Sequence, residues 1–240
     1  TWLIPGNTTG SNLLNNGLFV LLKKVPTTDG AWATDPYEAQ YLKLYDVTPP
    51  PAPNAPATSR PYAIGASAKF SWIAVADPEG GISGFHLTAG TSPGGSNVFD
   101  GIVPSTTSVT GAIGQTLYAR VSAINNAGVE GSFSPNSSGT ILLDPNGDYD
   151  GDGMNNANED LAGTNPLDSN SVLRILSIST NNLVTWSSVS GKTYRVLATA
   201  ILPTNFIPIS GLITAANSTA SFLDTGATNI QRFYRVNVLP

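Results

Sequence analysis

The chain has no cysteine, few charges and no long hydrophobic run. The missing cysteine excludes disulfide bridges, thiol catalysis and metal sites built on thiolates. Charged residues make up 11% of the 240 residues, against roughly a quarter in most globular proteins. Polarity comes instead from Ser, Thr and Asn, together with 24 Gly and 18 Pro. This composition predicts many short strands joined by tight turns.

Two further absences narrow the class of function. The sequence has no basic stripe and no recognition helix, so we expect no nucleic-acid partner. No apolar run approaches the ~20 residues of a membrane span, so we expect no membrane insertion. The chain starts at Thr1 without Met or a signal-like segment. We therefore expect a processed chain or fragment of an exported protein, located outside the cell or on its surface.

The acidic residues are concentrated in one place. Seven of the 16 acidic residues lie within 144–168, and no Lys or Arg occurs within 121–173. The rest of the chain is nearly balanced, with nine acidic against 11 basic residues. Such local acidity indicates a cation site rather than general surface repulsion.

The first 56 residues divide into a strand segment and a linker. Segment 1–47 contains an apolar run at 18–22 and an alternating run at 41–45, and both patterns predict strands. Two or three strands make a poor domain, so this segment should either pack on segment 57–141 or need a partner or a missing N-terminal region. The stretch 48–56 holds five prolines and predicts an extended linker at a domain boundary.

Segment 57–141 alternates between apolar and polar residues in short runs. Phe70 and Trp72 share one strand face, and Phe85 and Leu87 flank the chain's single histidine, His86, in the same way. About seven short strands separated by Gly/Pro turns predict a β-sandwich, with Trp72 in its core.

Part of this segment resembles a fibronectin type III domain. The run 118–128, Tyr-Ala-Arg-Val-Ser-Ala-Ile-Asn-Asn-Ala-Gly, is similar to the penultimate strand and turn of that family. Trp72 fits the family's tryptophan on the second strand, and the proline-rich entry is typical. The resemblance implies a spacer or binding scaffold and therefore a fold more than a function.

The acidic stretch contains D-x-D-x-D-G-x5-E within 148–159. Calcium takes about six to eight oxygen ligands, which a 12-residue loop supplies at alternating positions, with glycine at the sixth. Gly153 occupies that sixth position. The predicted ligands are Asp148, Asp150, Asp152, the carbonyl of Met154, Asn156 (through water or directly) and Glu159.

A short helix should follow the loop. We expect it at 155–162, ending at Gly163, whereas the residues before the loop read as the end of a strand. The unit is thus half an EF-hand and resembles the calcium repeats of dockerins and the bacterial thrombospondin type 3 repeat. A second ion is an open alternative, and its candidate ligands are Asp144, Asn146 and Asp168.

Segment 171–240 is again β. It resembles the small C-terminal β-sandwich of many secreted bacterial proteins, and Trp186 is expected in its core. Predicted strands are 172–179, 183–187, 193–199, 206–209, 219–223 and 232–238. The predicted fold class is therefore all-β: two tandem sandwiches (57–141 and 171–240), joined by the calcium loop and its single short helix (142–170).

Catalytic alternatives are weaker. His86 should point to solvent from mid-strand, which disfavours a Ser–His–Asp device. The carboxylates Asp77, Glu79, Asp100 and Glu130 lie in expected turns, and no pair stands out for glycoside hydrolysis. Sugar stacking on an aromatic platform competes with core or interface roles for Trp2, Trp32, Tyr37, Tyr41, Tyr45 and Tyr118. N-glycosylation sequons begin at Asn7, Asn136 and Asn217.

These patterns favour a non-catalytic extracellular structural or adhesive protein, such as a cell-surface or filament subunit rigidified by calcium. Calcium sensing is disfavoured because sensors pair their loops and expose Met, and this chain has one such loop and one Met. A homo-oligomer or a neighbouring domain is the expected partner. The alternative is a C-terminal spacer and carbohydrate-binding region of a secreted glycan-degrading enzyme.

Overall fold

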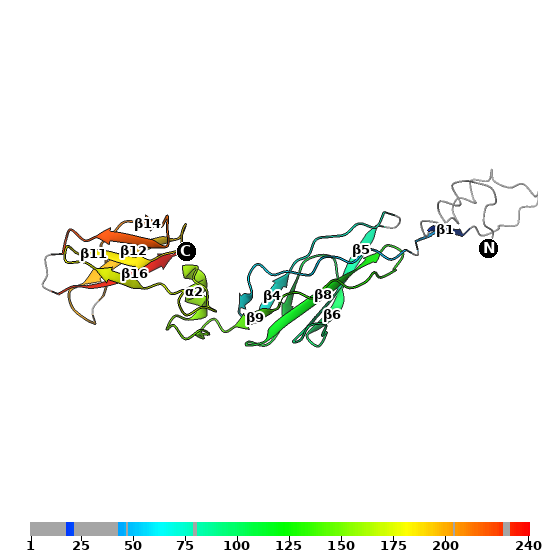
Figure 1. Cartoon of the computed structure of the whole chain (residues 1–240), viewed down its shortest axis with the longest axis horizontal. Coiled ribbons are helices and arrows are strands. Elements are labelled where there is room, and N and C mark those ends of the chain that lie inside the picture. Colours follow the sequence, from blue (N-terminus) through cyan, green and yellow to red (C-terminus); the bar gives the residue numbers. More distant parts are fainter. Residues whose placement is uncertain (1–17, 22–42, 47, 79–80, 204, 228–230) are drawn as a thin grey trace, which may run out of the picture. The chain divides into compact units, whose positions relative to one another are not determined.

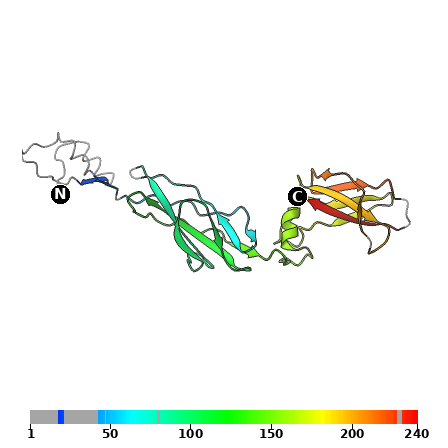
Figure 2. The same cartoon turned by 180° about the vertical axis from the view of Figure 1, so that it is seen from behind.

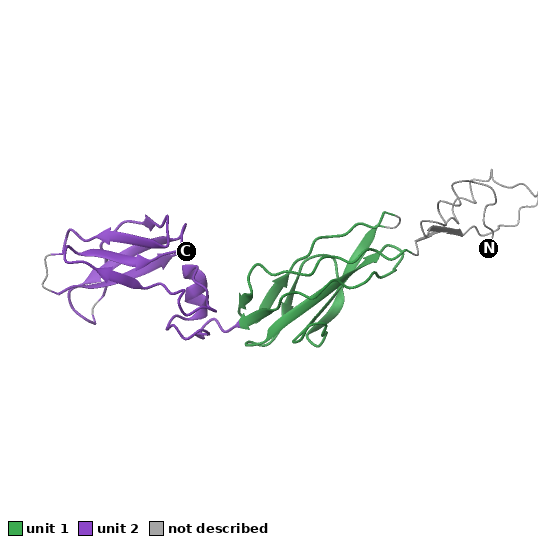
Figure 3. Ribbon diagram, viewed as in Figure 1, with its two compact units in different colours: residues 1–142 green, residues 143–240 purple. Residues whose placement is uncertain are grey.

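The computed structural model describes the backbone of residues 18–21 and 43–46, and it describes residues 48–78, 81–203, 205–227 and 231–240 in full. These residues form strands and one short helix, so the all-β prediction is confirmed (Figure 1). The chain divides into two compact units, Thr1–Leu142 (unit 1) and Leu143–Pro240 (unit 2) (Figure 3).

The apolar run near the start of the chain has a strand partner in its own segment. Strand β1 (Leu18–Leu21) pairs antiparallel with β2 (Lys43–Asp46). The run was expected to need a partner or a missing region; β2 satisfies the backbone of one of its edges. Any further partner stays a prediction, because the side chains of both strands lie outside the described residues.

The body of unit 1 is a seven-strand sandwich, as the alternating runs predict. A five-stranded sheet in the order β3-β9-β8-β5-β6 faces the two-stranded sheet β4-β7. The strands are β3 (Tyr62–Ile64), β4 (Ser67–Phe70), β5 (Ile82–Gly90), β6 (Phe99–Val103), β7 (Thr107–Thr110), β8 (Thr116–Asn125) and β9 (Thr140–Leu143). The resemblance to fibronectin type III domains implies a sandwich, and membership of that family stays a prediction.

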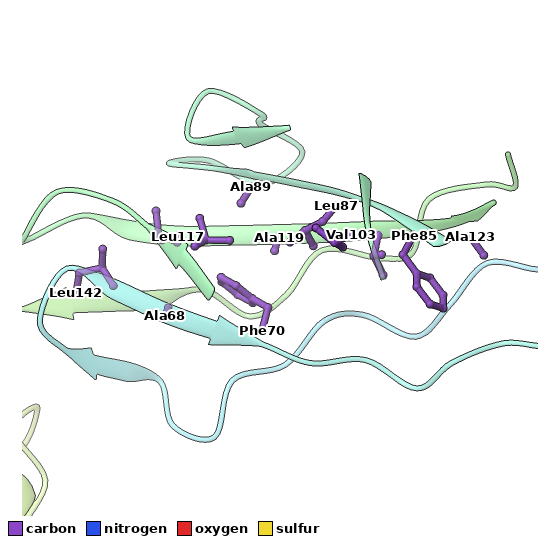
Figure 4. Close-up of a cluster of buried hydrophobic side chains, with 12 residues drawn as sticks. Ala68, Phe70, Phe85, Leu87, Ala89, Val103, Leu117, Ala119, Ala123 and Leu142 are labelled. Carbon is purple, nitrogen blue, oxygen red and sulfur yellow. The ribbon is translucent and has the colours of Figure 1, made fainter. Parts of the chain in front are cut away.

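The core of unit 1 is built from the inward-facing residues of both sheets. Phe70 on β4 and Leu87 on β5 are fully buried, as is Leu117 on β8 (Figure 4). Trp72 is half-buried and packs edge-on against Phe85, with 5.5 Å between the ring centroids. The predicted core role of Trp72 is therefore confirmed at the margin of the cluster.

An irregular segment, 126–139, covers the edge of β8 beyond its short pairing with β9. The amides of Ser134 and Ser137 donate to the carbonyls of Val121 and Ala119. The hydroxyls of the same serines accept from the amides of Val121 and Ala119, at 3.0 and 2.9 Å. Two serines three residues apart thus replace a neighbouring strand, and this segment carries Glu130 onto the sheet.

Within unit 1, the proline-rich stretch 48–56 packs against the sandwich at Asn125 and Gly131. The carbonyl of Thr48 accepts from the Asn125 side chain at 3.1 Å. Pro50 is buried, and a Cβ on Gly131 would lie 2.2 Å from its carbonyl oxygen. Only glycine therefore tolerates this approach of linker to sandwich.

Unit 2 contains two further sheets around Trp186, which is fully buried and lies 6.0 Å from the Tyr194 ring, as predicted. One sheet has the order β10-β11-β15, and in the other β12 pairs with β13, β14 and β16. The elements are α2 (Asn156–Ala162), β10 (Ile175–Ile178), β11 (Leu183–Ser187), β12 (Thr193–Thr199), β13 (Ile207–Pro208), β14 (Ile213–Thr214), β15 (Thr219–Leu223) and β16 (Phe233–Leu239).

Helix α2 is fastened to the sandwich of unit 2. The Lys192 ammonium donates to the carbonyl of Leu161 at 2.7 Å, at the negative end of the helix dipole. A Cβ on Gly163 would meet Lys192 and Val189 at 3.0 and 3.3 Å. In both views α2 lies beside β16 (Figures 1 and 2).

Candidate metal centre

The acidic loop closes on itself through backbone hydrogen bonds. The carbonyl of Asp144 accepts from the Gly147 amide at 3.1 Å and from the Asn156 side-chain amide at 2.7 Å. The Asn156 backbone amide donates in turn to the carbonyl of Gly147 at 2.8 Å. The start of α2 is therefore tied to the residues that follow β9.

Three aspartates converge inside this loop. One oxygen from each of Asp148, Asp150 and Asp152 lies within 4.8 Å of the others. Asp148 accepts from the amides of Gly151 and Gly153 at 2.8 and 2.9 Å. Asp150 accepts from the Asp152 amide at 3.2 Å, and Asp152 from the Met154 amide at 2.7 Å. Hydrogen bonds from the loop backbone thus orient each of the three carboxylates.

Two glycines allow the backbone conformations that the turns of the loop require. Gly151 and Gly153 have φ values of 79° and 94°, in the region that side chains rarely adopt. No atom would crowd a Cβ at either position, so the need for glycine comes from the backbone conformation itself. The glycine expected at the sixth loop position therefore has a left-handed conformation.

Three carboxylate oxygens in this loop are buried without a hydrogen-bond partner. They are Asp150 Oδ2, Asp152 Oδ2 and Glu159 Oε2, each from a different residue. A buried polar atom left unpaired costs about 1–3 kcal/mol, and more when it is charged. A bound cation removes that cost, because each oxygen then gains a positive partner in place of the water it lost.

Glu159 faces the same site from α2 and is fully buried. Its other oxygen receives the Thr164 hydroxyl at 3.4 Å. Burial raises the pKa of Glu159 to about 7, and the charges of Asp150 and Asp152 contribute to that rise. Burial likewise raises the pKa of Asp150, reinforced by Asp152 and Asp148. The cluster therefore resists carrying its full negative charge without a cation.

The helix ends where predicted and begins at Asn156, one residue later than predicted. Asn155 is the N-cap, and its side chain accepts from the Asn158 amide at 2.8 Å. Gly163 ends the helix with φ 78°, and the Thr164 amide donates to the Glu159 carbonyl at 3.0 Å. Glu159 lies one turn after the N-cap, and its buried side chain is on the loop side of the helix. The cap geometry thus positions the last predicted ligand.

Several of the predicted ligand residues make hydrogen bonds with the backbone: Asn156 within the loop, and Asp144 and Asp168 in local turns. Asn156 braces the loop: its oxygen accepts from the Tyr149 amide at 3.2 Å, while its nitrogen donates to Asp144. Its role as a ligand, like that of the Met154 carbonyl, stays a prediction. Asp144 accepts from the Asn146 amide and Asp168 from the Asn170 amide, so both carboxylates stabilise local turns.

The candidate second-ion residues are also outside the metal-ligating group. Among the described residues, the cluster of three or more potential ligands contains Asp148, Asp150 and Asp152, without Asp144 or Asp168. A second ion stays an untested alternative.

Two of the carboxylates considered for catalysis, Asp100 and Glu130, lie beside His86, although the sequence singled out no pair. His86 lies on the outer face of β5, as expected, and both of its ring nitrogens are held, by Asp100 and Glu130 at 2.7 and 2.8 Å. Ser122 is fully buried and bonds to Glu130 instead of His86, so no hydroxyl is set on the ring as a nucleophile would be. Asp77 is buried elsewhere, and Glu79 lies outside the described residues.

The other candidates are scattered. Tyr118 is half-buried on the outer face of β8. Asn136 accepts from the Gly94 amide at 2.7 Å through its side chain, and the Asn217 carbonyl accepts from Ser188. Outside the description of side chains lie Trp2, Asn7, Trp32, Tyr37, Tyr41 and Tyr45. The aromatic platform is therefore not assembled from described residues.

No protein family model and no curated protein matches this chain by sequence. Among solved structures it is similar to the FN1–FN3 domains of chicken CNTN1, at 14% identity and TM-score 0.31, covering 80% of this chain and 62% of that one. It is also similar to a beta-1,2-glucanase from Parabacteroides distasonis, at 18% identity and TM-score 0.26, covering 42% of this chain and 15% of that one. Scores this low carry no argument on function.

No helix among the described residues has the length and apolar character needed to span a bilayer.

Proposed function

We propose that the chain is a calcium-stabilised, non-catalytic structural or adhesive component that works outside the cell. The observation that carries this proposal is the set of three buried, unpartnered carboxylate oxygens on Asp150, Asp152 and Glu159. No Lys or Arg occurs within 121–173, and these oxygens have no hydrogen-bond partner among the described residues, so we infer that a cation from solution neutralises them.

Calcium fits this ligand set better than other common ions. The ligands are hard carboxylate oxygens on a 12-residue loop, and a glutamate at the twelfth position can bind through both oxygens. Magnesium demands a small octahedral site and retains several waters, which suits a loop with fewer carboxylates. Zinc prefers histidine nitrogen and cysteine sulfur, and the loop contains neither residue.

The ion would fasten the segment after β9 onto unit 2. It would hold Glu159 against the three loop aspartates, and Glu159 belongs to α2. The far end of α2 is already bound by Lys192 at the Leu161 carbonyl. Calcium would thus convert a Gly/Asp-rich stretch that directly follows unit 1 in the chain into a rigid part of unit 2.

An extracellular setting supports such a role, because calcium at ~mM concentration there saturates weak structural sites. Limited proteolysis of the full chain tests the rigidification. Cleavage within 144–168 should be slow in millimolar calcium and fast after chelation. Equal cleavage rates in both conditions would refute the structural role of calcium.

The structural or adhesive part of the proposal has its own test. Size-exclusion chromatography with light scattering, at high protein concentration in calcium, should detect self-association of a filament or surface subunit. A monomer under all these conditions would contradict self-assembly. Specific capture on a glycan array would instead favour a carbohydrate-binding region of a larger enzyme.

A further inference from the structure

A row of polar side chains crosses the outer face of the five-stranded sheet in unit 1. His86 on β5 lies between Asp100 on β6 and Glu130 on the segment that covers β8. Ser122 on β8 donates to the same Glu130 oxygen that faces His86, at 2.5 Å. The row runs across the strands, on the face opposite the core, since Leu87 and Val121 point inward.

The hydrogen bonds of this row define the charge of the ring. His86 Nε2 lies 2.7 Å from Asp100 Oδ1, and Nδ1 lies 2.8 Å from Glu130 Oε1. If both carboxylates are ionised, they only accept hydrogen bonds, and each ring nitrogen then needs a proton to donate. A neutral imidazole would direct a lone pair at one carboxylate. The arrangement therefore fits an imidazolium between two carboxylates.

The surroundings partly shield the ring. The Phe133 ring lies 5.3 Å from the His86 ring, and the Arg120 guanidinium lies 4.4 Å from the centre of the Phe133 ring. Arg120 also donates to Thr88 at 3.3 Å and brings a positive charge to this face. The side chain of His86 is 22% exposed, so protons reach a ring that is otherwise enclosed.

We propose that His86 is a proton-operated clasp that ties the edge strand β6 to the segment covering β8. With its proton, the ring joins Asp100 of β6 to Glu130 across β5 and β8. Without it, two carboxylates face a neutral ring, and one of the two hydrogen bonds is lost. Strand β6 is the last strand of the sheet, next to β5. Loosening of β6 therefore exposes the edge of β5 to pairing with other strands.

The pKa shifts give the pH window of the clasp. Burial alone would lower the pKa of His86, but the hydrogen bonds and charges of Asp100 and Glu130 outweigh it and raise the pKa above 6.5. Burial opposes ionisation of Glu130, but the hydrogen bonds from Ser122 and His86 bring its pKa below 4.5. The His86 contribution to stability is therefore complete below its unfolded pKa and lost as pH rises through the folded pKa. The Glu130 contribution is lost as pH falls through its own lowered pKa.

Nuclear magnetic resonance tests this clasp directly, because His86 is the only histidine. In the full chain with calcium, both ring nitrogens should be protonated at pH 6.5. The titration midpoint should lie above 6.5, and the amides of β6 should shift with the same midpoint. A midpoint at or below 6.5, or β6 amides that ignore it, would overturn the proposal.

Matched variants separate the clasp from a general charge effect. Asp100→Asn and Glu130→Gln should each lower the His86 midpoint by about half to one unit. Lys69→Gln changes one charge on the exposed face of β4, in the other sheet, and should leave the midpoint within about 0.2 units. Equal midpoints in the wild type and both carboxylate variants would refute the role of Asp100 and Glu130.

Discussion

The two units solve the same electrostatic problem in opposite ways. In unit 1, Asp100 and Glu130 are held by a partner from the chain itself, the ring of His86, for which we propose the imidazolium form. In unit 2, Asp150, Asp152 and Glu159 keep buried oxygens with no partner among the described residues. Carboxylates with a partner in the chain form a closed structural contact, whereas buried carboxylates without one are candidates for binding an ion. Removal of calcium and single substitutions should affect the two units differently if this contrast is correct.

Calcium removal should produce the largest effect, and only in unit 2. At a calcium concentration ~100 times Kd, binding stabilises the folded state by about 2.7 kcal/mol. For a unit of this size, that corresponds to a fall in Tm of about 10 °C or more on chelation. Differential scanning calorimetry, with a core marker such as Trp186 fluorescence for unit 2, should resolve the shift. An equal shift of both units would break the contrast.

Glu159→Gln should weaken calcium binding by on the order of 100-fold, because a bidentate charged ligand becomes a neutral one. The same change should stabilise unit 2 in chelator, since it removes a buried carboxyl whose charged form is disfavoured. Isothermal calorimetry and chelator melts measure the two effects.

The neighbouring Asp160→Asn is the matched control for this variant. It removes one carboxylate from the same helix, at a residue that is not among the predicted ligands, and should change affinity by on the order of twofold. A Glu159→Gln chain that is less stable than the wild type in chelator would contradict the account of Glu159.

Asp100→Asn should change the pH dependence of unit 1 and leave calcium binding unchanged. In the wild type, unit 1 should lose on the order of 1 kcal/mol as pH rises through the His86 midpoint. In the variant this loss should shrink and shift to lower pH, because the raised pKa of His86 depends on Asp100. Denaturant melts of the full chain between pH 6 and 9, in saturating calcium, provide the measurement.

Gly153→Ala should give the smallest effect. The backbone at Gly153 has φ 94°, and alanine there costs about 1 kcal/mol. No atom crowds the position, so the loop should still form, with calcium affinity reduced by about five- to tenfold. A calcium titration of this variant that matches the wild type would show that the left-handed conformation at Gly153 is not required for binding.

The two units also differ in how much of their structure could be predicted from the sequence. The aspartate-rich loop and the end of α2 could be predicted, because their determinants fall within 16 consecutive positions, from Asp148 to Gly163. Cap residues and the alternation of aspartates act locally, so no tertiary information is needed. The brace made by Asn156 was not predicted, because a loop pattern does not say which side chain turns back to the backbone.

The His86 row could not be predicted, because it depends on strand register. His86 stands opposite Ser122, and Thr88 opposite Asp100, in pairings that join distant parts of the chain. A shift of one residue would turn His86 into the core and separate the three charges. The two-residue strands β13 and β14 show a similar limit, since such short ladders carry no periodicity of their own; 206–209 was predicted as longer, and β14 was missed.

Calorimetric titration of calcium into the chelator-treated full chain tests the central claim most directly. The carboxylates of the loop should take up one calcium ion per chain, and uptake should be strongly weakened in Glu159→Gln but unchanged in Asp100→Asn. If no calcium-dependent heat is detected and the melting of unit 2 is the same with and without the ion, the unpartnered oxygens of the loop are not a calcium site and the account is wrong.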